Sequence, residues 1–126
     1  MTNAIPAPSG LGTRGGQFWR ETVAEFELTA SETALLTECC RTLDLVDELE
    51  AQVKRDGLTV AGASGQDRLH PAVTELRGQR LALHRLLAAL GLEDAEDGHK
   101  VPTATSLRAQ HAARARWAGH VRDTGA

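Results

Sequence analysis

The side chains that could act as nucleophiles, general acids or metal ligands have no catalytic spacing in this chain. Five histidines are scattered without the HExxH spacing of a zinc protease, and the two cysteines, Cys39 and Cys40, are adjacent. Neighbouring residues on a helix point in different directions, so the two thiols cannot easily form a disulfide, and they lack the CxxC spacing of a zinc site. We therefore expect the two cysteines to act as small apolar side chains in a reduced cytosol. For the chain as a whole we expect no catalytic residue, metal or cofactor.

The motifs of nucleotide-binding proteins and hydrolases are also missing. Residues 10–15 read GLGTRG, which matches GxGxxG, but no strand precedes them and no βαβ unit surrounds them, so we interpret them as a linker. No GxSxG, Walker A or paired-carboxylate motif is present. The acids Asp44, Asp47, Glu48 and Glu50 are explained by a solvated or salt-bridged helix face. The chain is therefore predicted not to be an enzyme.

Three basic residues in the second half of the chain have two interpretations. Arg77, Arg80 and His84 lie at i, i+3 and i+7 beside a leucine stripe. They either pair with the acids of the preceding helix, within or between subunits, or contact phosphate groups. The net charge of the chain is −3, and residues 25–56 carry nine acids against three bases. A DNA-facing surface must therefore be local.

The C-terminal segment has a different charge balance. Residues 93–126 begin with an acidic linker, and residues 100–126 then hold five bases and one acid. Residues 105–121 are Ala-rich and predict a helix that is marginal alone, so a disordered tail is the alternative. The arginines of this segment have few acids nearby, and Trp117 lies among them. They suit an anionic ligand or a partner protein, and a solvated tail is equally consistent with them.

A long amphipathic segment at about residues 28–56 is the first element that must position these side chains. Thr29 and Glu32 form a capping box at its start. Gly57 follows its end, where a left-handed C-cap is expected. Its apolar stripe is too broad for one partner helix.

A second amphipathic segment folds back on the first and makes the predicted fold all-α, a long antiparallel helical hairpin. It covers residues 71–90, with Pro71 at its first position and Gly91 after its end. The glycine-rich connector, residues 57–69, alternates over a stretch compatible with a tiny β-hairpin.

The N-terminal part is predicted to be a flexible leader followed by a short helix. Residues 1–16 are rich in Gly, Pro and Ser and form the leader. Residues 17–27 place three apolar side chains on one helical face, which we expect to dock on the hairpin: Trp19, Val23 and Phe26. Residues 17–92 are thus the predicted helical oligomerisation domain.

Composition limits how stable a single copy can be. The chain has 126 residues and 3% aromatic residues, so its core must be built from Leu, Val and Ala. Domains of this size bury a limited fraction of their surface and often need oligomerisation. No apolar run approaches the ~20 residues of a membrane-spanning helix, and no signal peptide is present. We expect a homo-oligomer whose helices and subunits are held by Leu35, Leu36, Leu43, Val46, Leu49, Val53, Leu76, Leu83 and Leu87.

The order of several short motifs resembles a known family. The chain reads GQFWR at residues 16–20, a Leu/Cys/Asp pattern at 36–50, DGLTV at 56–60, HPA at 70–72 and LGL at 90–92. This order and spacing resemble the small terminase subunit of tailed phages, in the P27-like group.

The resemblance implies a non-enzymatic packaging factor. Such subunits assemble into rings, recognise double-stranded viral DNA and regulate the large subunit, the ATPase and nuclease, in the cytoplasm of the bacterial host. On this model Trp117 is the candidate for docking to the large subunit, and the candidate DNA contacts are Arg77, Arg80, Arg108, Arg114 and Arg116. The alternative is a small dimeric helical adaptor or transcriptional regulator.

Overall fold

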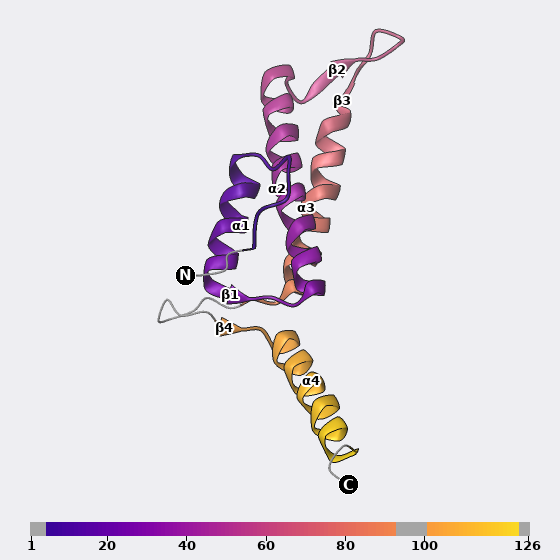
Figure 1. The fold of residues 1–126 in the computed structure, drawn as a ribbon. Helices are drawn as coiled ribbons and strands as arrows, with labels where there is room; N and C mark the ends of the chain where they lie inside the picture. Colours follow the sequence, from indigo (N-terminus) through magenta and orange to yellow (C-terminus); the bar gives the residue numbers. More distant parts are fainter. Residues whose placement is uncertain (1–4, 93–100, 124–126) are drawn as a thin grey trace.

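The predicted helical hairpin is the centre of the fold. The computed structural model describes residues 5–92 and 101–123, with only the backbone at 101, 110, 113 and 117–123. Helices α2 (Ala30–Asp56) and α3 (Pro71–Leu90) lie side by side and antiparallel (Figure 1). A third helix, α1 (Thr13–Glu25), packs on α2, and α4 (Ala104–Asp123) follows near the C-terminus. The all-α prediction is confirmed.

Both predicted ends of α2 are present, with one difference in conformation. The Thr29 hydroxyl accepts a hydrogen bond from Glu32 N at 3.2 Å, and Thr29 N donates to Glu32 Oε1 at 2.9 Å, which confirms the capping box. Gly57 ends the helix with φ 86° and ψ 173°, so its φ is positive but its ψ is extended. The left-handed conformation expected for Gly57 is therefore wrong, because its ψ is extended where the chain turns toward the strand that follows.

The connector forms the small β-hairpin with which its alternation is compatible. Strand β2 (Thr59–Ala61) pairs antiparallel with β3 (Asp67–Leu69), with Thr59 opposite Leu69, and the hairpin extends past the ends of α2 and α3 (Figure 1). Gly65 takes the positive φ of 79° that the tight turn requires.

A buried histidine joins the two ends of this connector. His70 is 6% exposed, and its Nδ1 accepts a hydrogen bond from Ala72 N at 3.0 Å, which caps α3. Because Nδ1 accepts, Nε2 is the donor to Asp56 Oδ2, 3.0 Å away at the end of α2. Pro71 stands at the first turn of α3, and Gly91 ends α3 in the left-handed conformation, as predicted.

Helix α1 begins at Thr13, four residues before the predicted start at residue 17, so the interpretation of residues 10–15 as a linker is wrong for residues 13–15. The reason is Asp44 of α2, whose carboxylate accepts hydrogen bonds from Gly12 N at 2.6 Å and Gly15 N at 2.8 Å. It acts as an N-cap supplied by another helix. A Cβ at Gly15 would lie 2.4 Å from Asp44 Oδ2 and 2.6 Å from Cys40 O, so only glycine fits this approach.

The core lies where α1 and α3 meet α2. Trp19, Val23 and Phe26 are buried as predicted, and Trp19 Nε1 donates to Ile5 O at 3.0 Å. Trp19, Val23, Leu36, Cys39, Cys40 and Leu90 form one buried cluster.

The predicted oligomerisation residues differ in burial within one copy. Leu36, Leu43, Val46 and Leu76 are buried, Leu35, Leu49, Val53 and Leu83 are half-buried, and Leu87 is 39% exposed. The buried ones serve the fold of a single chain, and the role of the set between subunits stays a prediction.

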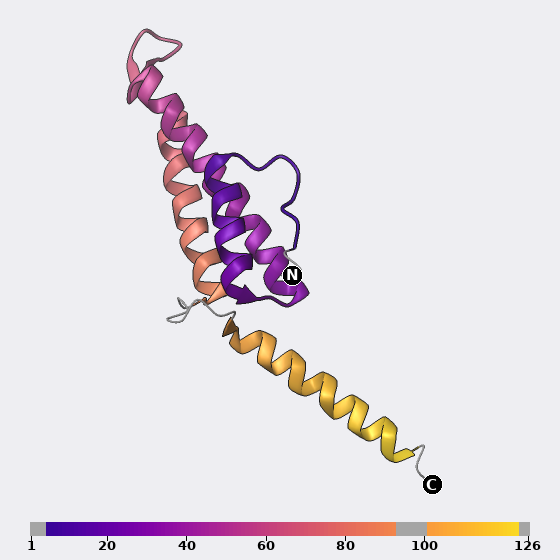
Figure 2. The same ribbon diagram turned by 60° about the vertical axis from the view of Figure 1, so that its left-hand side comes forward.

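The C-terminal segment is attached near the start of α2. Strand β1 (Phe26–Glu27) pairs in parallel with β4 (Val101–Pro102), a pairing that the sequence did not indicate. The Thr103 hydroxyl donates to the buried carboxylate of Glu32, and Thr103 Oγ1 accepts from Ser106 N at 3.1 Å. Helix α4 then leads away from the other helices (Figures 1 and 2). The predicted acidic linker lies largely outside the described residues.

Replacing Asp44 should destabilise the protein more than replacing its neighbour in the same acidic run. Asp44→Ala removes two charge-assisted hydrogen bonds and should lower the free energy of unfolding by about 2–3 kcal/mol, measured by urea denaturation. Asp47→Ala is the control, because its 2.9 Å ion pair with Arg14 is solvent-exposed and should contribute less than about 1 kcal/mol. Equal losses in the two variants would contradict the capping role of Asp44.

Candidate docking groove and basic helix

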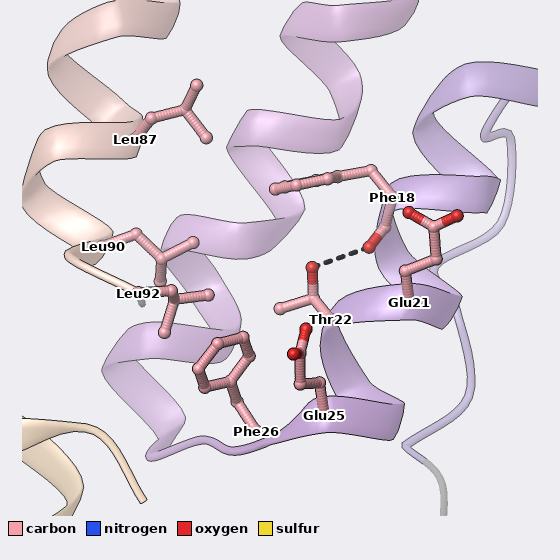
Figure 3. A pocket seen from close by; sticks show the side chains of 8 residues that line it. All are labelled: Phe18, Glu21, Thr22, Glu25, Phe26, Leu87, Leu90 and Leu92. Atoms are coloured by element: carbon pink, nitrogen blue, oxygen red, sulfur yellow. Dashed lines mark hydrogen bonds between the residues drawn. The ribbon is translucent and has the colours of Figure 1, made fainter. Parts of the chain in front are cut away.

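A hollow between α1 and α3 has leucines on the α3 side and Phe18 with polar side chains on the α1 side. Its volume is about 260 Å³, which is below the roughly 300–1,000 Å³ of small-molecule sites. In Figure 3 the Phe18 ring extends from α1 toward Leu87 of α3. The Thr22 hydroxyl donates to Phe18 O at 2.7 Å, so it is already satisfied. The lining residues are Phe18, Glu21, Thr22, Glu25, Phe26, Leu87, Leu90 and Leu92.

A second hollow of about 400 Å³ continues the first along the same two helices. The two share Phe18, Glu21 and Leu87, and Leu43 of α2 lines the second hollow between the helices. Together they form one groove, which we call the docking groove. It exists because α1 and α3 both pack on α2 and make few contacts with each other.

The polar side chains that line the docking groove already have partners within the chain. At its edge, Glu21 Oε1 accepts from Gln17 Nε2 at 3.0 Å, and Arg14 pairs with Asp47. Among the described residues no buried side-chain nitrogen or oxygen lacks a hydrogen-bond partner. In the same part of the chain no group of three His, Cys, Asp or Glu residues could hold a metal ion. The phenylalanines and leucines of the groove are therefore the surface that a second molecule can bury.

The structure separates the predicted DNA-contact residues into two groups. Arg80 forms an ion pair with Glu50 of α2, which is the within-chain pairing considered for it. Arg77 is exposed on α3 and forms no ion pair with any other described residue. The α3 arginines lie on the helical hairpin, whereas the other group lies on α4 (Figure 1). The fold does not unite them into one surface.

Helix α4 presents three arginines to solvent. Arg108, Arg114 and Arg116 are all exposed, and Arg108 Nε bonds only locally, to Ala104 O at 3.3 Å. Leu107 is 43% exposed on the same helix. Beyond its first turn, where Ser106 is buried, α4 leads away from the other helices, and an isolated Ala-rich helix is marginal in water. The side chain of Trp117, the predicted docking residue, lies outside the described residues.

Three residues that organise these surfaces were missed by the sequence analysis. Asp44 was assigned to a solvated face, His70 was counted among scattered histidines, and Glu32 was recognised only for its capping box. Their partners, Gly15, Asp56 and Thr103, are 29, 14 and 71 residues away in sequence. The glycine pair after residue 14 and the Asp-Gly and His-Pro pairs around the connector were the available signals.

The two cysteines are part of the core, as predicted. Burial, with smaller contributions from Cys39 and Asp44, raises the pKa of the Cys40 thiol to about 12, and burial also raises the pKa of Cys39. Both thiols are free and fully enclosed. They therefore stay protonated and unreactive at neutral pH.

Thiol reactivity should follow unfolding. At pH 8 a disulfide reagent such as DTNB should react with neither cysteine in the folded protein and with both in urea. Because folding raises the Cys40 pKa above its ordinary value of 9.0, its stabilising effect is complete below pH 9 and is lost as the pH rises toward 12. Urea midpoints at pH 8 and 10.5 should fall more in the wild-type chain than in Cys40→Ala. Rapid labelling of the folded protein by DTNB would contradict the enclosed position of the two thiols.

No helix among the described residues is long and apolar enough to cross a bilayer. Comparison with known proteins gives one match: residues 16–99 match a family described as phage terminase, small subunit. This segment is more than half of the chain and includes most of α1 and all of α2 and α3, with the docking groove between them. No curated protein and no solved structure matches the chain.

Proposed function

The chain belongs to the phage terminase small-subunit family, and from this membership we propose that it is a ring-forming, non-catalytic DNA-packaging factor. It would recognise viral DNA and regulate the large subunit, which supplies ATPase and nuclease activity, in the cytoplasm of the bacterial host. The single observation that carries the proposal is the family match across α1, α2 and α3. The match is to the family as a whole, and the P27-like group stays a prediction.

The helical scaffold supports an assembly role. The docking groove can bury apolar side chains but holds no polar group that lacks a partner within the described residues. Exposed leucines lie on α2, α3 and α4, where a second molecule can cover them. A dimeric helical adaptor or regulator remains the competing function. A dimer of about 27 kDa, twice the 13.5 kDa of one chain, would favour that alternative in light scattering.

For DNA binding we favour α4 over α3. Arg108, Arg114 and Arg116 of α4 are exposed and lie in a segment with five bases and one acid, so they can approach phosphates without loss of an ion pair to another described residue. Arg80 would have to leave Glu50. Arg77 and Arg80 stay predicted contacts, but the proposal rests on Arg108, Arg114 and Arg116.

Removal of the α4 arginines should lower the salt dependence of DNA binding. Each lost phosphate contact reduces the magnitude of the slope of log affinity against log salt concentration by roughly 0.9. The triple variant Arg108→Ala, Arg114→Ala and Arg116→Ala should therefore reduce the slope by up to about three times this value. The control removes three exposed bases elsewhere, by Lys54→Ala, Arg55→Ala and Arg68→Ala. Fluorescence anisotropy with duplex DNA measures both. An equal loss in the control would contradict the assignment to α4.

Regulation of the large subunit is tested by ATP turnover. Adding the purified chain to the large subunit of the same phage should change its ATPase rate, and Trp117→Ala should weaken this effect while Trp117→Phe retains it. Circular dichroism of both variants controls for folding. No change in turnover and no change in DNA packaging would rule out the proposed function.

A further inference from the structure

The α2–α3 hairpin has two exposed leucines that point away from its core. Leu45 on α2 is 38% exposed, and Leu81 on α3 is 52% exposed. Neither lines the docking groove. Leu45 follows Leu43, which lines the groove, by two residues, or about 200° around the helix, so it lies on the opposite side of α2. The two leucines therefore mark surfaces distinct from that groove.

Leu45 lies in an acidic stripe on the outer face of α2. Glu38, Arg41, Leu45 and Glu48 follow one another at three- and four-residue steps, and all four are exposed. We call this set the α2 patch. Arg41 is 3.5 Å from Glu38, so these two charges offset each other. Glu48 forms no ion pair with another described residue, which leaves the patch negative beside Leu45.

Leu81 lies in a basic stripe on the outer face of α3. Arg77, Leu81 and Arg85 follow at four-residue steps, and all are exposed. We call this set the α3 patch. Neither arginine forms an ion pair within the described part of the chain. Gly78 lies in the same region, with nothing within 4 Å of where its Cβ would be, so the surface is open to a closely packed helix.

We propose that the α3 patch of one copy packs on the α2 patch of the next copy, with Leu81 against Leu45 and Arg77 beside Glu48. This inference rests on the proposed function, since it names the surface through which the subunits assemble. The partner is a second copy because the two patches each centre on an exposed leucine and are opposite in charge, and each copy carries both.

The charges favour contact between unlike patches. Two α3 patches packed antiparallel would bring Arg77 against Arg85, which is repulsive. Two α2 patches packed on each other would leave Leu81 exposed. Contact between unlike patches is head-to-tail, and such contacts build rings when the rotation closes.

The direction of the two helices sets the register. Helices α2 and α3 are antiparallel within one chain (Figure 1). If neighbouring copies are related by rotation about an axis parallel to these helices, α3 of one copy is antiparallel to α2 of the next. With Leu81 against Leu45, Glu48 lies ~4.5 Å further along α2, and Arg77 lies ~6 Å back along α3. In an antiparallel pair these two offsets have the same direction, so Arg77 meets Glu48. At the other end Arg85 lies beside Arg41, whose charge is offset by its ion pair with Glu38.

Charge reversal tests this contact with the full-length chain. In light scattering across a concentration series, Glu48→Arg and Arg77→Glu should each raise the concentration at half-assembly about tenfold or more, and the double variant should restore it. Leu81→Asp should also weaken assembly, and it leaves the core intact because Leu81 is half exposed. Arg20→Glu, an exposed charge on α1, is the control. Circular dichroism checks that each variant is folded.

The outcomes distinguish failure of the proposed ring from failure of this particular contact between copies. If the wild-type chain is a monomer throughout, the proposed ring and this contact both fail. If it assembles but the single variants assemble equally well, only this contact is wrong. Rescue of Glu48→Arg by Arg85→Glu rather than by Arg77→Glu would overturn the antiparallel register. A dimer insensitive to Arg77→Glu and Leu81→Asp would indicate contact between α2 patches instead.

Discussion

The carboxylate of Asp44 is the constraint on which the placement of α1 depends. A helix of 13 residues that contains Gly15 and Gly16 has little stability of its own in water, and Gly12 provides no side-chain cap. Asp44 supplies the missing acceptor from α2 and approaches so closely that a Cβ at Gly15 would clash. With α1 held there, Trp19 completes the core and Phe18 forms one wall of the docking groove.

Acidic residues of α2 therefore have different tasks although they lie close in sequence. Asp44 caps α1, Asp47 pairs with Arg14, and Glu50 pairs with Arg80. Glu48 alone of these faces away from the neighbouring helices and is available to another molecule. The same helix thus organises its own chain on one side and offers charge to a partner on the other. On the proposed contact, this division lets one charge-rich helix be both a scaffold and an assembly surface.

Local signals predicted much of the fold. The capping box at Thr29 and Glu32, the Pro71 and Gly91 boundaries of α3, and the hairpin in the connector all appear in the structure. Each depends on residues a few positions apart, where backbone geometry restricts what the side chains can do. The docking groove was not predicted, because it depends on the separation of α1 and α3 across α2. Nor was the parallel pairing of β1 with β4, two segments more than seventy residues apart.

By itself the sequence determined the helical periods, the residue positions of the ends of α2 and α3, the apolar character of the cysteines and the motif order that resembles small terminase subunits. These follow from spacing and side-chain type, which do not depend on distant contacts. Only the tertiary structure decided which acid meets which base or amide. Asp44, Asp47 and Glu48 have similar side chains, and the rotation of α2 against α1 and α3 gives them a cap, an exposed ion pair and a free charge. That rotation is set by burial of Leu36, Cys39 and Cys40, because apolar packing fixes the face that each helix turns inward.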